Sequence, residues 1–268
     1  MSPEQLTAAR TLLTGVRSLM FDLDGCIWFG AQLAPGAAEL VATLRAEGFG
    51  VAFLTNTSTH DSAYLADKLT RLGIPAGHED VLSPIDVIGQ HPLLLARPAT
   101  FVIGSAYVKS AVSKVTAVTE DPEVAKVVVL ARDTELDYNR LSDAMHVLNR
   151  GGSLLALNLD ARVPVEGGRF LPGNGAFAAA LTTASGVEAQ AAGKPAPFFF
   201  HAAMERFGFD AASTVMVGDN LDSDIAGAIQ TGIRSVQVGG EHFSAANPAP
   251  VADLELDGVA AILDVLIR

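Results

Sequence analysis

Two aspartates separated by one residue, Asp22 and Asp24, follow a short apolar run and precede a glycine in the segment SLMFDLDG (18–25). The apolar run is short and bounded, as in a buried strand. Two carboxylates this close repel each other unless a cation or a shared proton relieves the repulsion. The pair suits metal-assisted phosphoryl transfer, in which one carboxylate attacks and the other moves protons. Calcium loops and ordinary turns contain the same pattern, although Cys26 stands where an EF-hand loop requires Asp or Asn.

Two further clusters offer groups that bind phosphate. In the segment FLTNTST (53–59), an expected strand runs into the polar residues Thr55, Asn56 and Thr57. Their side chains and the free backbone N–H groups of a following helix can donate to phosphate oxygens, but a simple helix cap is the alternative. Lys194 stands between a glycine and a proline before a helical stretch. Its ammonium could contact a phosphate or carboxylate, with a solvated turn lysine as the alternative.

A fourth cluster is acidic. The apolar run 214–217 leads to Gly218 and Asp219, and Asp222 and Asp224 follow. Asp219 is placed to bind a hard cation through oxygen, and Asp224 could orient a water molecule bound to that cation. Asp222 fits the acidic start of a helix. The alternative is that all three are helix N-terminal acids.

Short apolar runs alternate with amphipathic helical stretches along the chain, which indicates βαβ units and parallel sheets. The expected strands cover residues 18–23, 51–54, 100–103, 126–131, 153–157, 214–217 and 235–238, and the clearest helices cover 35–47, 60–72 and 197–207.

Composition restricts the possible partners. The chain has 268 residues, and 30 acidic against 18 basic residues give a net charge of −12, which argues against nucleic acid or an anionic membrane surface as partner. Although 49% of the residues are hydrophobic, no run approaches the roughly 18 that a membrane span needs. The single cysteine excludes an intrachain disulfide and fits a reducing compartment. With no secretory signal at its start, the protein is expected in the cytoplasm.

The four clusters, in this order, resemble the motifs of the haloacid dehalogenase (HAD) superfamily. The segments DGCIWFG (24–30) and LPGNG (171–175) resemble its subfamily IIA, the branch of NagD-like, p-nitrophenyl, pyridoxal-phosphate and glycolate-phosphate phosphatases. The resemblance implies an α/β fold: a Rossmann-like parallel-sheet core with an inserted C2-type α/β cap domain. The long segment between Asn56 and Lys194 leads us to place the core at 1–80 and 190–268 and the cap at 81–189.

The resemblance also implies a role for each matched residue. Asp22 would be the nucleophile that becomes an aspartyl-phosphate, and Asp24 would be the general acid and base. Mg²⁺ would be held by Asp22, Asp219 and the backbone carbonyl of Asp24, with Asp224 holding a metal-bound water. The phosphate would be bound by Thr55, Asn56, Thr57 and Lys194.

Within the expected cap, Asn158 and Asp160 end a strand and Asn174 opens a helix. These residues are candidates for contacting the leaving group of the substrate and so setting specificity. The equally good alternative is a structural role, in which they form a strand-end turn and a helix cap. A homodimer formed through the cap is a further expectation.

The leading hypothesis is thus a Mg²⁺-dependent phosphatase for a small phosphorylated metabolite. Two other classes stay open. A receiver-type protein also combines Asp, Thr, Lys and Mg²⁺ but keeps its phosphoryl group. A non-hydrolytic module would bind a phospho-metabolite on the same scaffold.

Overall fold

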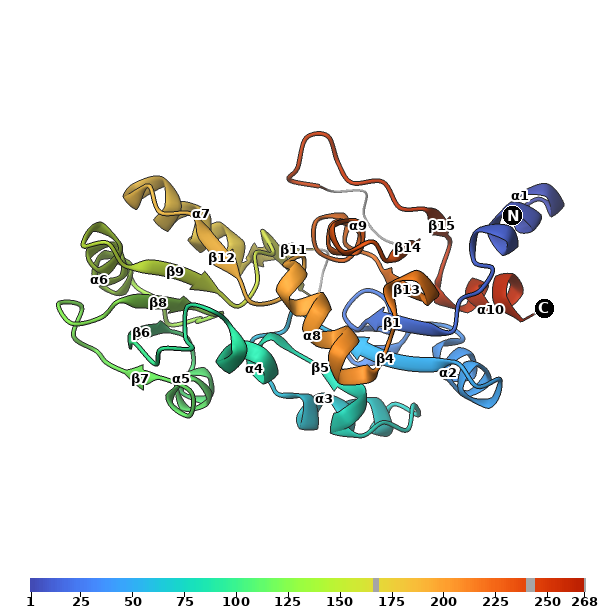
Figure 1. The fold of residues 1–268 in the computed structure, drawn as a ribbon, viewed down its shortest axis with the longest axis horizontal. Coiled ribbons are helices and arrows are strands. Elements are labelled where there is room, and N and C mark those ends of the chain that lie inside the picture. Colours follow the sequence, from blue (N-terminus) through green and yellow to red (C-terminus); the bar gives the residue numbers. More distant parts are fainter. Residues whose placement is uncertain (166–168, 240–243, 268) are drawn as a thin grey trace. The chain divides into compact units, whose positions relative to one another are not determined.

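The computed structural model describes residues 1–165, 169–239 and 244–267, and the chain forms two compact units (Figure 1). Unit 1 comprises Met1–Thr55, Ser62–Leu82 and Phe200–Arg268. Unit 2 comprises Asn56–Asp61 and Ser83–Phe199. The assignment of residues 81–189 to a substrate-reading cap stays a prediction.

Unit 1 is built on one parallel sheet of six strands. In sheet order these are β15 (Leu254–Leu256), β14 (Arg234–Val238), β13 (Thr214–Gly218), β1 (Ser18–Asp22), β4 (Gly50–Leu54) and β5 (Val81–Leu82). Counted along the chain within this sheet, the order is 3-2-1-4-5-6 when read from β5, which is that of a Rossmann-like doubly wound fold. The chain order reverses between β1 and β13, and in such sheets ligands bind beyond the carboxyl ends of the strands at that point.

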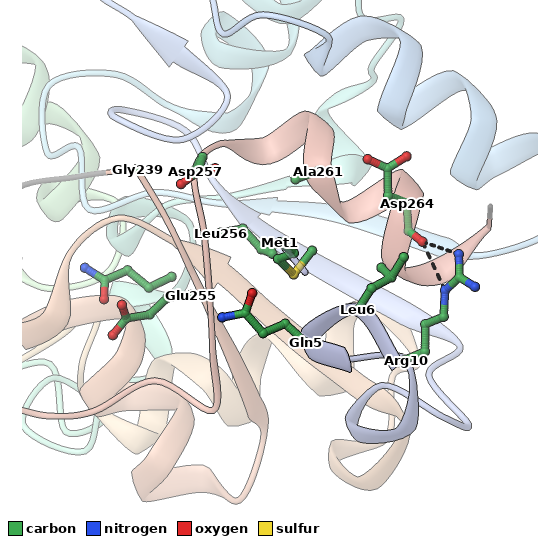
Figure 2. Close-up of a pocket in the computed structure, with 11 residues that line it drawn as sticks. Met1, Gln5, Leu6, Arg10, Gly239, Glu255, Leu256, Asp257, Ala261 and Asp264 are labelled. Carbon is green, nitrogen blue, oxygen red and sulfur yellow. Dashed lines mark hydrogen bonds between the residues drawn. The ribbon is translucent and has the colours of Figure 1, made fainter. Parts of the chain in front are cut away.

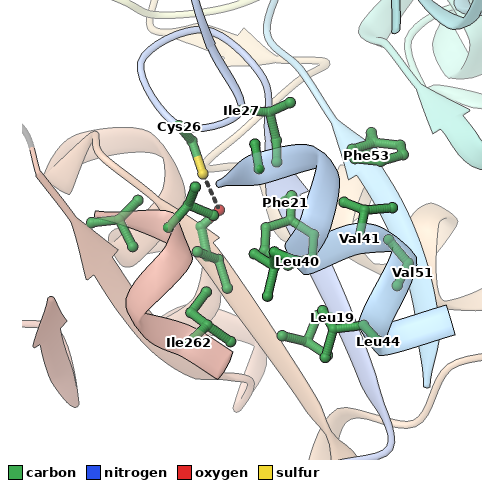
Figure 3. Packing of buried hydrophobic residues seen from close by; sticks show 14 of the residues in the cluster. Leu19, Phe21, Cys26, Ile27, Leu40, Val41, Leu44, Val51, Phe53 and Ile262 are labelled. Carbon is green, nitrogen blue, oxygen red and sulfur yellow. Dashed lines mark hydrogen bonds between the residues drawn. The ribbon is translucent and has the colours of Figure 1, made fainter. Parts of the chain in front are cut away.

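The strands of this sheet are short and apolar because helices cover them. Every residue of β1 is buried, as expected for a parallel strand that is covered on both faces. Figure 3 shows Leu40 and Leu44 of α2 (Ala37–Ala46) beside Leu19 and Phe21 of β1, within one cluster of buried side chains. The predicted strand 18–23 ends one residue early, so Asp22 is the last residue of β1.

Helices lie on both faces of the sheet. The cluster that contains Leu19 also takes in residues of α1, α2, α3 and α10. Elsewhere in the unit the Phe200 ring packs directly against Gly227, where a Cβ would be 2.5 Å from its Cζ. The other helices are α1 (Pro3–Leu12), α3 (Ser62–Arg71), α9 (Ala226–Thr231), α10 (Ile262–Leu266) and α8 (Pro197–Phe207), which begins in unit 2 and continues into unit 1.

Unit 2 has its own parallel sheet of five strands. In sheet order these are β12 (Ala189–Ala191), β9 (Ser153–Ala156), β8 (Val127–Leu130), β6 (Ala99–Ile103) and β7 (Ala117–Val118). Alternate residues of β8 enter two clusters: Val128 packs with residues of α6 (Tyr138–Asn149) and α7 (Asn174–Ser185), and Val129 packs with residues of α5 (Ala106–Ser113). Unit 2 also contains α4 (Pro84–Val87), the 3-10 turn Ile88–Gln90, and the antiparallel pair β10 (Arg162–Val165) and β11 (Arg169–Pro172).

In the parts of the chain described, no helix combines the length and apolar character that crossing a bilayer requires.

Candidate active site

Three acidic residues of unit 1 meet at the carboxyl ends of neighbouring strands. Asp22 ends β1, Asp219 follows β13, and Asp224 lies in the π-helical turn Leu221–Ile225. Each contributes a carboxylate oxygen to a group whose atoms all lie within 4.8 Å of one another. Asp22 is 6% exposed and Asp224 is fully buried. Buried carboxylates this close require a cation or a shared proton, and an all-oxygen donor set suits a hard divalent ion.

The turn after β13 orients Asp224. The backbone N–H of Asn220 donates to Oδ2 of Asp224 at 3.1 Å. The side-chain oxygen of Asn220 accepts from the N–H groups of Asp222 and Ser223, which caps the start of the turn. Gly218 allows the approach, since a Cβ there would be 2.7 Å from Cβ of Asp224. The turn therefore presents Asp224 to the acidic group in a constrained orientation.

Gly25 is required where the chain passes Asp219. Its φ is +97°, and a Cβ would be 2.6 Å from Cγ of Asp219. We expect Gly25→Ala to destabilise the fold by about 1–2 kcal/mol, because a side chain is strained at positive φ, and to displace the Asp219 carboxylate as well. Thermal unfolding and calorimetric titration with Mg²⁺ measure the two effects.

Gly30 is the matched control for this prediction. It also has a positive φ, +61°, but no atom lies within 4 Å of its added Cβ. Gly30→Ala should therefore lower stability without changing metal binding. Equal Mg²⁺ affinity in the two variants would contradict the proposed contact between residue 25 and Asp219.

Asp24 is exposed, yet its carboxylate has a fixed partner. The indole Nε1–H of Trp28 donates to Oδ1 of Asp24 at 2.7 Å. Trp28 itself is fully buried. It begins β2 (Trp28–Phe29), which pairs with β3 (Gln32–Leu33). The carboxylate of Asp24, the proposed general acid, is thus hydrogen-bonded to an aromatic side chain that is itself packed in the core.

Lys68 of α3 completes this group. Its Nζ lies 3.8 Å from the centre of the Trp28 ring, a cation–π contact. Burial lowers the pKa of Lys68, and the nearby negative charge of Asp24 partly opposes that shift. Neither the Trp28 hydrogen bond nor Lys68 was part of the sequence-based site. Trp28 lies in the segment DGCIWFG (24–30), but no local sequence pattern links Lys68 to it.

A second group of predicted residues belongs to unit 2 and is centred on Asn56. Its Nδ2 donates to the backbone oxygen of Lys194 at 3.0 Å and to Oδ1 of Asp160 at 3.1 Å. Nδ2 of Asn158 donates in turn to the backbone oxygen of Asn56 at 2.7 Å. The side chain of Lys194 is 1% exposed, and a buried ammonium requires polar or charged partners. Asn56 therefore links the backbone of Lys194 to Asn158 and Asp160, the two residues of the expected cap that follow β9.

Asn174 uses its amide inside unit 2. Its Nδ2 donates to the backbone oxygens of Leu130 and Asn158, at 3.0 and 2.9 Å. The Asn158 amide thus holds the carbonyl of Asn56, and the Asn174 amide holds carbonyls at the end of β8 and just after β9, which supports the structural alternative. Substrate contact by Asn158, Asp160 or Asn174 stays a prediction.

The two threonines of the expected phosphate-binding motif lie in different units. Thr55 is buried after β4, and its N–H donates to the backbone oxygen of Leu82 at 3.1 Å. Thr57 shares a hydrogen bond with Thr59, with 3.1 Å between the two Oγ1 atoms. The structure brings together Asp22, Asp219 and Asp224 within unit 1, and Asn56, Asn158 and Asp160 with the backbone of Lys194 within unit 2. That both groups act on one phosphate stays a prediction.

One cavity in unit 1 is not lined by the acidic cluster. It has a volume of about 950 Å³ and is lined by residues of α1, β14, β15 and α10. Figure 2 shows Arg10 at its rim, where the guanidinium donates to the backbone oxygen of Asp264. A smaller cavity of about 350 Å³ borders Gly25 and Cys26, directly after the proposed general acid. Of the two, only the smaller adjoins the predicted site.

Comparison with known proteins identifies relatives over most of the chain. The family model described as haloacid dehalogenase-like hydrolase matches residues 19–117, and the model described as HAD-hydrolase-like matches residues 191–261. Human glycerol-3-phosphate phosphatase is 32% identical over 258 residues, which cover 85% of this chain and 80% of that protein. The 5′-nucleotidase YutF of Bacillus subtilis is 32% identical over 223 residues, which cover 83% of this chain and 86% of that protein.

A solved structure agrees with these relatives. The glycerol phosphate phosphatase of Mycobacterium tuberculosis, crystallised in complex with magnesium, superposes with a TM-score of 0.74 at 31% identity. The match covers 85% of this chain and 68% of that chain.

Proposed function

The chain belongs to the haloacid dehalogenase-like hydrolases, and we propose that it is a Mg²⁺-dependent phosphatase that hydrolyses the phosphate monoester of a small metabolite. The observation that carries this proposal is the gathering of Asp22, Asp219 and Asp224 at the carboxyl ends of β1 and β13. The names of the relatives support it, because they are phosphatases of glycerol phosphate and of nucleotides.

The donor set fits Mg²⁺. Asp22, Asp219 and the backbone carbonyl of Asp24 would hold the ion, and Asp224 would hold one of its waters. When bound, Mg²⁺ would neutralise charge on the transferring phosphoryl group. A chain with net charge −12 needs such a local positive charge to attract a phosphate.

The reaction would proceed in two displacements at phosphorus. A carboxylate oxygen of Asp22 attacks, the new O–P bond forms, and the ester P–O bond breaks as Asp24 protonates the departing oxygen. Asp24 then removes a proton from water, which attacks the aspartyl-phosphate and releases inorganic phosphate. Thr55, Asn56, Thr57 and Lys194 would bind the phosphate oxygens throughout.

The proposed substrate class is broad because the relatives differ in their substrates. Glycerol phosphate and nucleotides have leaving groups of very different size. Asn158, Asp160 and Asn174 of unit 2 stay candidates for reading that group. Since Asn158 and Asn174 hold main-chain carbonyls, we propose that these two residues act by shaping the segments after β4 and β9.

A phosphate-release assay tests the function. The panel contains glycerol 3-phosphate, nucleoside monophosphates, sugar phosphates and p-nitrophenyl phosphate, each with Mg²⁺ and after removal of metal with EDTA. We expect at least one physiological ester to turn over at about 1–10³ s⁻¹. EDTA should abolish this turnover and added Mg²⁺ should restore it.

Two outcomes of this assay contradict the proposal. A stable phospho-protein without phosphate release identifies a receiver-type acceptor. Metabolite binding without hydrolysis in Mg²⁺ identifies a binding module.

A further inference from the structure

The contact between Trp28 and Asp24 is unusual because an exposed carboxylate is bound by a fully buried donor. Trp28 is 0% exposed, whereas Asp24 faces solvent. A hydrogen bond from an N–H group to a charged acceptor is stronger than one between neutral groups. The indole therefore restricts rotation of a carboxylate that solvent alone would leave mobile.

The backbone around the pair fixes the indole in turn. The N–H of Trp28 donates to the oxygen of Leu23 at 2.9 Å, and its carbonyl accepts from the N–H of Gly25 at 2.8 Å. Trp28 is thus bonded to the residues on both sides of Asp24. The five-residue segment 24–28 closes on itself, and the side-chain hydrogen bond crosses that closed turn.

Lys68 adds charge on the face of the ring. Its ammonium lies 3.8 Å from the centre of the indole ring, and Asp24 is close enough to attract it electrostatically. A cation over the π face withdraws electron density and strengthens the indole N–H as a donor. Lys68 therefore reinforces the bond to Asp24 from another element, α3.

We propose that Trp28, supported by Lys68, is a positioning residue that holds the Asp24 carboxyl group in one orientation, with Oδ2 directed at the leaving oxygen of the substrate. This inference rests on the proposed function. Oδ1 accepts the indole N–H, which leaves Oδ2 as the oxygen that would deliver the proton. As the ester P–O bond breaks, the Oδ2–H bond breaks and the proton joins the departing oxygen, while the bond from Asp22 to phosphorus forms.

A positioning role and a purely structural role of Trp28 can be distinguished by how the hydrolysis rate depends on the basicity of the leaving group. An alkoxide departing from an alkyl ester such as glycerol 3-phosphate must be protonated as it leaves. The p-nitrophenolate ion is stable and needs little help. Misplacing the Asp24 proton therefore slows alkyl esters more than p-nitrophenyl phosphate.

The test compares kcat/KM for both esters in Trp28→Phe, which keeps the aromatic packing and removes the N–H. We expect the alkyl ester to lose about 10–10²-fold more than the aryl ester, the size expected for one hydrogen bond to the carboxylate charge that develops on Asp24 as its proton leaves. In the background of Asp24→Asn, Trp28→Phe should cause no further selective loss, because the group it positions is gone.

Lys68→Met keeps the test informative if Trp28→Phe does not fold. It should also reduce kcat/KM for the alkyl ester more than for the aryl ester, by a smaller factor of about 3–10. Lys68→Arg should give the wild-type ratio of the two kcat/KM values because it keeps the cation. The matched control is Arg71→Met on the same helix, where the arginine lies 6.0 Å from the Tyr64 ring and has no contact with Trp28 in the described structure. Its ratio should equal that of the wild type.

Equal losses on both esters, or no loss, would overturn the positioning role. Failure of the wild-type protein to hydrolyse any ester would instead overturn the proposed function, and the phosphate-release assay above detects that case separately.

Discussion

Asp22→Asn is expected to abolish phosphate release, with a loss of up to about 10⁶-fold in kcat, the size seen when a covalent nucleophile is removed. The amide has no charged oxygen with which to attack phosphorus. The fold should survive, because asparagine has nearly the same shape and Asp22 belongs to a cluster of three carboxylates. In EDTA the variant should be at least as stable as the wild type, since one of three repelling charges is gone.

Three measurements check this prediction. The first is phosphate release. The second is acid-quenched detection of a hydroxylamine-sensitive phosphoryl group on the protein. The third is thermal unfolding in EDTA. Asp22→Ala guards against slow deamidation of the new asparagine, which would regenerate the aspartate.

Asp67→Asn is the matched control, because Asp67 lies on the exposed side of α3. It should keep wild-type turnover. If Asp22→Asn kept turnover within tenfold of the wild type, Asp22 would not be the nucleophile.

Asp219→Asn is expected to weaken Mg²⁺ binding by at least about 10²-fold and to lower kcat by about 10²–10³-fold at the wild type's saturating Mg²⁺. The asparagine keeps an oxygen but loses the negative charge that attracts the ion. Calorimetric titration with Mg²⁺ measures affinity without reference to activity. In addition, Mg²⁺ should raise the unfolding temperature of the wild type, because it binds the folded state, and this rise should shrink in the variant.

Asp222→Asn is the control three residues further on. The Asp222 carboxylate accepts hydrogen bonds from the hydroxyl of Ser244 and the N–H of Ala245, so it has a separate structural partner. Its replacement should leave Mg²⁺ affinity unchanged. Equal loss of affinity in both variants would mean that general negative charge, and not ligation by Asp219, attracts the ion.

The local parts of the fold follow from the sequence. The apolar runs 18–23 and 214–217 have the length and boundaries of buried parallel strands, and β1 and β13 occupy them with ends shifted by one residue. The order of the four motifs indicated the haloacid dehalogenase-like family, and the comparisons confirm it. These features can be predicted from the sequence because the spacing of hydrophobic residues and the ends of strands depend on residues that are close together in the chain.

The partners of each side chain came only from the tertiary structure. Asp22 and Asp219 meet because β1 and β13 are hydrogen-bonded neighbours, although most of the chain separates them. Lys68 reaches Trp28 because α3 packs in the same core as β1. Asn158 and Asn174, equally suited by sequence to bind substrate, hold backbone carbonyls. Residue types and local spacing determined which groups are available for chemistry. Sheet order and helix packing, which depend on contacts between distant segments, decided which of those groups touch.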